Sequence, residues 1–407
     1  MQKQQSMIGL ASGGLLAMAA AIGIGRFVYT PILPVMLESL AWSKAEAGLV
    51  ASSNFLGYLI GALLAVRPIA ASSQRRGLIV ALLVSATTTA GMALQSQIAI
   101  LMALRLFGGA ASAFVIVLAS SLVLARLSAA GRGSFAAIHF AGVGAGIMVS
   151  AAIVSAMLAM GAGWQAMWTW TGALEFAATG LGAVLIPEQT TVTAAAPAPS
   201  AAQSPHGLPM LVIAYGLFGF GYVITATFLV TSVRMSGELR QLEAWIWVLF
   251  GFAAVPSVAL WSWIGGRIGA LTAFALACLA EAIGVAASVE WLTVPGICLS
   301  AVLLGGTFMG ITALGLMAGR QLSSADPQRA LGLMTASFAF GQMIGPAAAG
   351  FVIDNLGSLR LPSLIAAGAL VVAAGLAVAA SRAVTAGAPG GTSVDTPRTM
   401  PPRNPQP

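Results

Sequence analysis

Charged side chains are scarce in this sequence. They make up only 7% of its 407 residues, whereas an ordinary soluble domain carries roughly 25% because its outside faces water. Hydrophobic residues make up 58% of the chain. This shortage of charge excludes a soluble globular protein and indicates a chain whose outside faces lipid.

Cysteine and lysine are also rare. The two cysteines, Cys278 and Cys298, are too few for a disulfide framework or a metal cluster, and we interpret them as packing residues. The two lysines, Lys3 and Lys44, lack the Gly-Lys-Ser/Thr context that holds phosphates, which disfavours an ATP-driven pump. No Gly-x-Ser-x-Gly sequence occurs, so we do not expect an enzyme. Nothing in the sequence indicates a metal or another cofactor.

Long apolar runs fill most of the chain. A run of about 20 apolar residues is long enough to cross a hydrocarbon core of about 30 Å as a helix. Continuous runs favour helices over barrel strands, in which apolar and polar residues alternate. The sequence therefore predicts an all-α integral membrane protein with about twelve transmembrane helices. The predicted spans are 8–37, 45–71, 77–95, 97–126, 131–158 and 163–186, then 208–233, 241–264, 267–288, 291–318, 329–355 and 359–383.

Positive charge is distributed unevenly between the two sides of these spans. With the N-terminus inside, twelve of the 18 Lys and Arg residues fall in cytoplasmic segments and four in outer loops. The inner residues are Lys3, Arg67, Arg75, Arg76, Arg126, Arg132, Arg267, Arg320, Arg329, Arg382, Arg398 and Arg403, and the outer ones are Lys44, Arg234, Arg240 and Arg360. The positive-inside rule places both termini in the cytoplasm. It also accounts for the net charge of +7 without a nucleic-acid partner.

Two segments lack apolar runs. Residues 187–207 are rich in Pro, Ala, Ser and Thr, and we expect a cytoplasmic linker between a six-helix bundle at 1–186 and a second at 208–383. Residues 384–407 have the same character, so we expect a disordered cytoplasmic tail.

The two predicted bundles share a glycine pattern. Glycines four residues apart leave bare backbone on one helix face, where a neighbouring helix can approach closely. The fifth span carries Gly133, Gly142 and Gly146, and the eleventh carries Gly332, Gly341 and Gly345, followed by Pro346, which adds a bend. Likewise, Arg75-Arg76-Gly77 parallels Arg267-Ile268-Gly269. Ordinary small-residue packing is the alternative, but the equal spacing favours a parallel repeat whose halves rock against each other.

With these motifs, the sequence resembles the major facilitator superfamily from about residue 8 to residue 383. The loop from Arg67 to Gly77, the fourth-span run around Arg105 and the paired glycine series carry the likeness. Segments 23–34, 52–65 and 331–350 look like its YbfB-like branch, a group with little assigned function. The resemblance implies two six-helix bundles related by a pseudo-twofold axis, with a substrate site between them. Structural or gating roles are expected for Arg75, Arg105, Gly142, Gly146, Arg267, Gly341, Gly345 and Pro346.

Arg26 is the main candidate for binding a substrate. A charge inside a span costs at least about 2.5 to 3.5 kcal/mol, so such a residue needs a partner or a wet cavity. Arg26 shares a helix face with Tyr29 and Thr30, and with Arg105 it can hold an anion. The alternative is that these arginines lock helices together. Further cavity candidates, chosen for polarity within apolar spans, are Asn54, Tyr58, Tyr222, Thr225 and Gln342.

Three titratable residues are candidates for coupling. Glu175 lies near the middle of its span, where burial favours a neutral carboxyl group that can load and release a proton. His139 is the only histidine within a span, and imidazole titrates near neutral pH. Both have structural hydrogen bonding as the alternative. Glu281 also invites a proton, and its alternative is to face the outer headgroups.

The sequence therefore predicts a secondary transporter that works by alternating access. We expect it in the bacterial inner membrane as a monomer that couples a small molecule to protons or another ion. Export of a small organic compound, as in an antiporter, is favoured, and import of a small organic anion is the alternative. A passive channel or an intramembrane enzyme fits less well, because the repeated spans suit rocking.

Overall fold

The computed structural model describes residues 2–65, 71–187, 207–323 and 327–387, and all regular structure in these ranges is helical. Arg67, residues 188–206 of the expected linker and residues 388–407 of the expected tail lie outside the described residues. Because the last helix ends at Gly387, the first four residues of the expected tail are helical.

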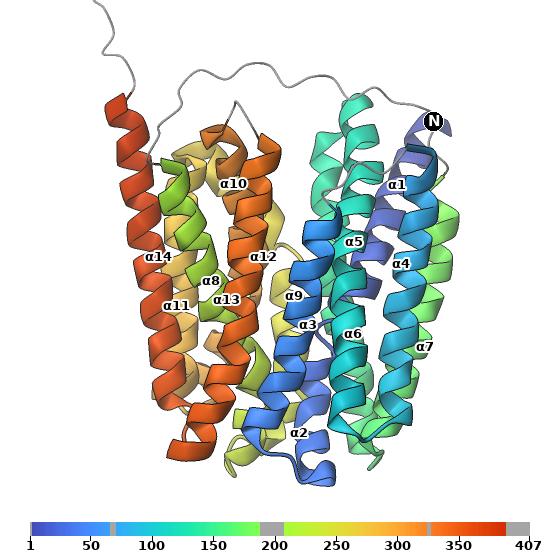
Figure 1. Ribbon diagram of the computed structural model, residues 1–407, viewed down its shortest axis with the longest axis vertical. Coiled ribbons are helices and arrows are strands. Elements are labelled where there is room, and N and C mark those ends of the chain that lie inside the picture. Colours follow the sequence, from blue (N-terminus) through green and yellow to red (C-terminus); the bar gives the residue numbers. More distant parts are fainter. Residues whose placement is uncertain (1, 66–70, 188–206, 324–326, 388–407) are drawn as a thin grey trace, which may run out of the picture.

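The described helices form two bundles that stand side by side (Figure 1). The N-terminal half contains α1 (Gln2–Met18), η1 (Ala19–Ile24), α2 (Tyr29–Leu40), α3 (Lys44–Ala65), α4 (Ala71–Gly91), η2 (Met92–Leu94), α5 (Ile98–Ala129), η3 (Gly133–Phe135), α6 (Ala136–Ala159) and α7 (Trp164–Leu185). The C-terminal half contains α8 (Gly207–Met235), η4 (Arg240–Leu242), α9 (Glu243–Ala254), α10 (Ser257–Ile268), α11 (Ala270–Glu290), α12 (Val294–Leu322), α13 (Pro327–Leu356) and α14 (Arg360–Gly387). Helix α1 begins and α14 ends at one end of the molecule, called the terminal end below (Figure 1).

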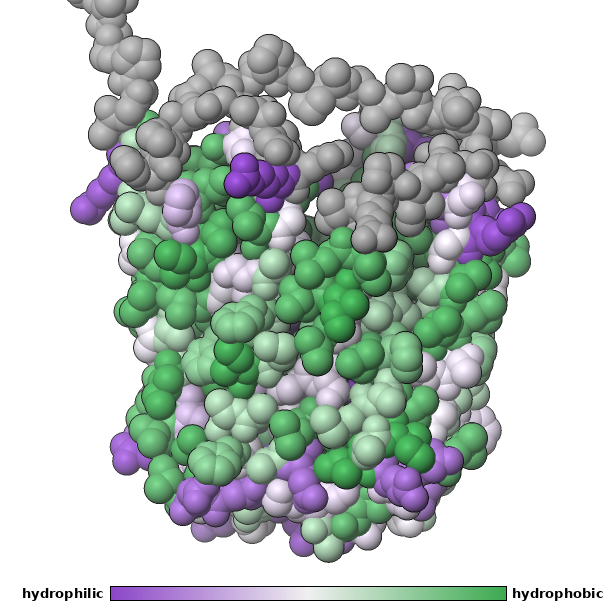
Figure 2. Space-filling model, in the orientation of Figure 1, coloured by the Kyte–Doolittle hydropathy of each residue, from purple (hydrophilic) through white to green (hydrophobic). Residues whose placement is uncertain are grey.

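These helices are long and apolar enough to span a membrane. Among the described residues, ten helical segments meet this description, or eleven if the bent pair α9 and α10 is one span. Helix α7 is equally long, with 22 residues, and packs against α1 and α4, although its Trp and Thr residues make it less apolar. Counting α7 and the bent pair, the described helices match the twelve predicted spans. A belt of hydrophobic side chains covers the visible face, with hydrophilic residues toward both ends (Figure 2).

Two of the predicted spans are interrupted rather than straight. The first changes from the α-helix α1 to the π-helix η1 and then to a turn at residues 25–28 before α2 begins. The eighth bends by 41° between α9 and α10, at Val255 and Pro256. Proline has no backbone N–H and its ring clashes with the carbonyl group of the preceding turn, which explains the second break. The sequence analysis treated both spans as continuous.

The paired glycine series holds helices together within each half. A Cβ atom on Gly142, Gly146 or Gly341 would collide with the backbone of a neighbouring helix, and one on Gly345 would collide with the side chain of Val223. Gly133 and Gly332, the first glycine of each series, have nothing within 4 Å of an added Cβ atom. The pairs in contact are Gly142 with Leu15 and Gly146 with Ala19, where α6 meets α1 and η1, and Gly341 with Gly216 and Gly345 with Phe220, where α13 meets α8. In both halves the partner residues are four apart, so the two bundles repeat the same helix packing.

Different glycines bring the two halves into contact. The halves meet mainly where α3 packs on α13 and α6 packs on α9. Gly48 lies against the carbonyl group of Pro346, and Gly350 lies against the carbonyl group of Lys44. At the second contact, Gly144 and Gly251 face the backbone of the opposite helix. Because backbone atoms cannot move aside as a flexible side chain can, a larger residue at these positions would push the halves apart.

We predict that Gly48→Val weakens the contact between the halves. The added side chain would overlap the backbone at Pro346, and overpacking of this kind costs about 1–3 kcal/mol. The midpoint of thermal unfolding of the purified protein in detergent should fall by several degrees. Gly368→Val on α14 is the matched control, since a Cβ atom there would have nothing within 4 Å. Equal midpoints for the two variants would contradict this account of the interface.

Candidate functional site

Arg26 lies in the turn that breaks the first span, and its side chain crosses from one half to the other. Its Nη2 atom donates a hydrogen bond of 2.6 Å to the Oε1 atom of Gln342 on α13. The Nε2 atom of Gln342 donates to the hydroxyl oxygen of Tyr222 on α8. Arg26, Tyr222 and Gln342 are all buried. With Tyr58, they form what we call the central site.

Aromatic rings surround the guanidinium group of Arg26. Its carbon atom Cζ lies 4.4 Å from the ring centre of Tyr58, 4.8 Å from that of Phe55 and 5.6 Å from that of Phe27. Rings at these distances attract a cation through their electron-rich faces. The Nε atom of Arg26 has no hydrogen-bond partner among the described residues. The site thus holds a cation with an unused donor in an aromatic setting.

Arg105 stabilises the broken segment from behind. From α5, it donates hydrogen bonds of 2.8 Å to the carbonyl oxygens of Gly25 and Arg26, which the helix break leaves free. Its own carbonyl oxygen accepts a hydrogen bond of 2.9 Å from the side-chain amide of Asn54 on α3. Arg105 and Asn54 therefore join helices, which is the structural alternative raised from the sequence.

Glu175 lies against the same break, close enough to Arg105 to interact with its charge. Its Oε1 atom accepts a hydrogen bond of 2.5 Å from Ser85 on α4, and Thr89 stands beside it. A Cβ atom on Gly25 would lie 2.8 Å from Oε1, so the bare glycine lets the carboxyl group reach the backbone of the first span. The Oε2 atom has no partner among the described residues. Glu175 is fully buried, and its hydrogen-bond partner, Ser85, differs from that of Arg26.

The other proposed substrate residues are placed differently. The Tyr29 hydroxyl donates to the carbonyl oxygen of Ala47 at 2.9 Å, within the N-terminal half. Thr30 donates to the carbonyl oxygen of Ala226 at 2.8 Å and so links α2 to α8 across the halves. Thr225 is buried, and its hydroxyl group has no partner among the described residues. Tyr29 and Thr30 thus serve backbone contacts, while Thr225 keeps a free polar group.

The remaining candidates lie away from the central site. His139 on α6 is buried beside Gly14 of α1, and its Nε2 atom is 3.2 Å from the hydroxyl oxygen of Ser120 on α5. Arg75 donates hydrogen bonds of 2.7 and 2.8 Å to the carbonyl oxygens of Ile186 and Ala183, at the end of α7. Arg267 stacks on the ring of Trp263 at 3.7 Å. Each of these residues makes contacts within its own half.

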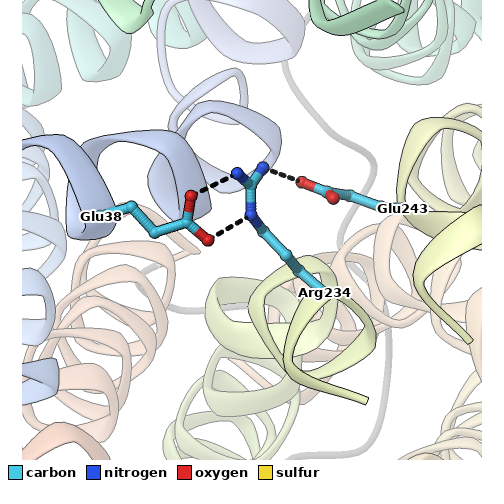
Figure 3. Close-up of polar contacts among 3 residues, drawn as sticks. All are labelled: Glu38, Arg234 and Glu243. Carbon is cyan, nitrogen blue, oxygen red and sulfur yellow. Dashed lines mark hydrogen bonds and ion pairs between the residues drawn. The ribbon is translucent and has the colours of Figure 1, made fainter. Parts of the chain in front are cut away.

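Ion pairs in the described part of the chain lie at the end opposite the terminal end. Arg234 on α8 donates to both carboxylate oxygens of Glu38 on α2, at 2.7 and 2.5 Å (Figure 3). It also donates to Glu243 on α9 at 2.7 Å. Glu38 belongs to the N-terminal half, and the other two residues belong to the C-terminal half. A guanidinium group that binds one carboxylate through two bonds fixes their relative geometry.

A second contact closes the same end. The two carboxylate oxygens of Asp354 on α13 accept hydrogen bonds from the backbone nitrogens of Lys44 and Ala45, at 2.9 and 2.8 Å. These are free N–H groups in the first turn of α3, where a negative charge also complements the helix dipole. We call this region, with the Glu38–Arg234–Glu243 cluster, the sealed end. The sequence analysis missed these residues, because it used loop charges only to assign topology.

A known protein family and several solved structures resemble this chain. The family described as "Uncharacterised MFS-type transporter YbfB" matches residues 18–378. The structure of the nucleoside transporter NupG is similar with a TM-score of 0.68 and 17% sequence identity, over 93% of this chain and 99% of that one. A bacterial homologue of the human lysosomal transporter Spinster, solved in an inward-facing and occupied conformation, gives a TM-score of 0.66 and 14% identity, over 94% and 98% of the two chains. No curated protein matches the sequence.

We predict that Arg234→Gln opens the sealed end. Losing the charge removes both bonds to Glu38. We expect this loss to cost the closed arrangement about 1–2 kcal/mol, which is enough to shift the ratio of closed to open molecules about 5- to 30-fold. Spin labels at Leu40→Cys and Ser236→Cys, with Cys278→Ala and Cys298→Ala as background, should then show a longer distance by pulsed electron spin resonance.

Arg360→Gln is the control for the Arg234 experiment. It breaks an ion pair with Glu290 of 2.7 Å that lies at the same end but within the C-terminal half. The label distance should not change. An equal response to Arg360→Gln, or none to Arg234→Gln, would rule out Arg234 as a contact that holds the halves closed.

Proposed function

The chain belongs to the YbfB-type family of major facilitator superfamily transporters, and on that premise we propose that this secondary transporter carries a small organic anion together with protons. The observation that supports this proposal is the buried Arg26, whose side chain joins the two halves and has no carboxylate partner among the described residues.

The chemistry of the central site favours an anion. A buried guanidinium group is stabilised by charge-assisted hydrogen bonds, and a carboxylate can accept two of them at once. The hydrogen-bond acceptors of Arg26 among the described residues are neutral, namely the amide oxygen of Gln342 and the hydroxyl oxygen of Tyr58. The rings of Phe27, Phe55 and Tyr58 offer flat apolar surfaces around the cation. We infer that the substrate presents a carboxylate or similar group to Arg26 and an apolar or planar part to the rings.

The position of Glu175 favours import over export. Its carboxyl group contacts Ser85 and the backbone at Gly25, while the Arg26 side chain points to Gln342. A proton on Glu175 and an anion on Arg26 can therefore be bound at the same time, as in symport. If the proton and the anion competed for one site, only one of them could be bound at a time, and antiport would be favoured. The arrangement thus supports import, the alternative from the sequence, over the export that the sequence favoured.

The orientation follows from charge. We propose that the terminal end faces the cytoplasm of a bacterial cell, because Arg75, Arg126, Arg267 and Arg320 belong to the cytoplasmic segments by the positive-inside rule. The sealed end then faces outward, and the described structure is closed toward the outside. We further propose that the protein works as a monomer, since each chain contains both halves of the central site.

We predict that Arg26→Gln abolishes most anion binding. Hydrogen bonds to a charged group contribute about 1.5–3 kcal/mol, so the affinity should fall about 10- to 100-fold. Uptake of a panel of radiolabelled organic anions into proteoliposomes measures the effect once the panel has identified a substrate. Arg382→Gln, an exposed arginine on α14, is the control that also removes one positive charge. Transport of a neutral or cationic compound that is unaffected by Arg26→Gln would overturn the anion assignment.

We predict that Glu175→Gln separates substrate movement from proton movement. Glutamine keeps the shape and can accept the bond from Ser85, but it cannot carry a proton. Proteoliposomes with an internal pH-sensitive dye should lose substrate-driven acidification. Exchange of labelled for unlabelled substrate at equal pH should persist, because it needs no net proton transfer. If acidification survives in the variant, Glu175 is not the carrier.

A further inference from the structure

Glu281 is a second buried carboxyl group, in the other half of the molecule. It lies on α11 with no exposed surface, and neither carboxylate oxygen has a hydrogen-bond partner among the described residues. The sequence analysis left open that it faces the outer headgroups, and its complete burial shows that alternative to be wrong. An isolated carboxylate ion in such surroundings is very costly, so the neutral acid is the form that fits.

Among the residues that the structure describes, the surroundings of Glu281 contain polar groups but no cation. Cys278 lies one turn earlier on α11, Thr307 faces it from α12, and Tyr222 from α8 lies within range of its charge. The arginines on the helices packed around α11 are engaged or exposed elsewhere. They are Arg234 on α8, Arg267 on α10, Arg320 on α12, and Arg360 and Arg382 on α14.

Glu281 occupies the position in the C-terminal half that Thr89, a neighbour of Glu175, occupies in the N-terminal half. Counted from the matching glycines, Thr89 follows Gly77 and Glu281 follows Gly269 by the same number of residues, twelve. Thr89 on α4 stands beside Glu175. On α11, the position equivalent to Thr89 of α4 is therefore itself a carboxylic acid, Glu281. A buried carboxyl group thus lies beside this position in the N-terminal half and at this position in the C-terminal half.

Tyr222, a residue of the central site, lies within electrostatic range of Glu281. Its ring stacks on Phe308 of α12 at 5.8 Å, next in sequence to Thr307, and its hydroxyl oxygen accepts the hydrogen bond from Gln342. Gln342 in turn binds Arg26. Tyr222, Gln342 and Arg26 thus form a hydrogen-bonded series that crosses between the halves, and Glu281 lies within electrostatic range of Tyr222.

We propose that Glu281 is a second proton-binding site, loaded in the closed arrangement and emptied when the halves move and water or the charge of Arg26 reaches it. No covalent bond other than O–H forms or breaks, and the proton passes to water. This inference rests on the proposed proton coupling but assigns a different residue in a different half. A cycle with both sites occupied would move two protons for each anion.

Infrared spectroscopy of the protein in lipid tests the assignment without a known substrate. A neutral buried carboxylic acid has a carbonyl stretch that is separate from the amide bands and shifts in D₂O. As pH rises, the wild-type protein should lose intensity in this band, and Glu281→Gln should lack the component due to one carboxyl group. Glu290→Gln, an exposed glutamate on the same helix, should keep that component. Identical band intensity in wild type and Glu281→Gln would overturn the proposal.

Two further measurements keep the result interpretable. Glu281→Asp should restore the band if the glutamine variant folds poorly. In the wild-type protein, a lipophilic carbodiimide, which reacts with neutral carboxyl groups in apolar surroundings, should modify the peptide that contains Glu281. The proposal would be rejected if the carbodiimide formed no adduct at Glu281 and the carboxylic acid band did not change in Glu281→Asp.

Failure of the proposed function looks different from failure of this site. If the proposed function is wrong, the anion and proton fluxes assigned to Arg26 and Glu175 will not be observed, but the infrared band of Glu281 will still be present. Conversely, the Glu281 band can be absent while Glu175-dependent acidification persists.

Discussion

Two hydrogen bonds from Arg105 to the carbonyl oxygens of Gly25 and Arg26 stabilise a helix break in the middle of the membrane. Lipid supplies no hydrogen-bond donors, so a break at this depth is tolerated only where protein groups satisfy the exposed backbone. Once the break is stable, the Arg26 side chain can leave its own helix and reach Gln342, and Gly25 can accept the close approach of Glu175. The central site, its cation and its neighbouring acid therefore all depend on a residue that binds neither substrate nor proton in the proposed mechanism.

The contacts between the halves are of two kinds. Near the sealed end they are charged and directional, as in Glu38–Arg234 and in the binding of the α3 N-terminus by Asp354. Along α3 and α13, and along α6 and α9, they are backbone surfaces in close contact at Gly48, Gly350, Gly144 and Gly251. Charged contacts can separate and reform in water, whereas the glycine surfaces can remain in contact as the angle between helices changes. This division suits a molecule whose halves rock without parting.

The sequence was sufficient for the architecture, because the bilayer forces long apolar helices and leaves few alternatives. It also identified Arg26, Tyr58, Tyr222 and Gln342 as polar residues within apolar spans, and the structure brings these four together. Their proximity could not be predicted, since Arg26 and Gln342 are 316 positions apart and meet only through the packing of the halves. The π-helix before Arg26 and the bend at Pro256 were missed, because hydropathy measures apolar length and does not detect backbone breaks. The pairing of Glu38 with Arg234 was missed because loop charges carry no information about their partners.

The backbone character of the interface has an evolutionary consequence. Where halves meet through glycine and carbonyl groups, the moving surface does not depend on which side chains line the central site. Substitutions around Arg26, at Phe27, Phe55 or Tyr58 for example, can change the preferred substrate without disturbing the surfaces on which the halves turn. A single scaffold can thus diversify among many compounds while its mechanics stay constant, and low sequence identity among proteins of the same shape is the expected result.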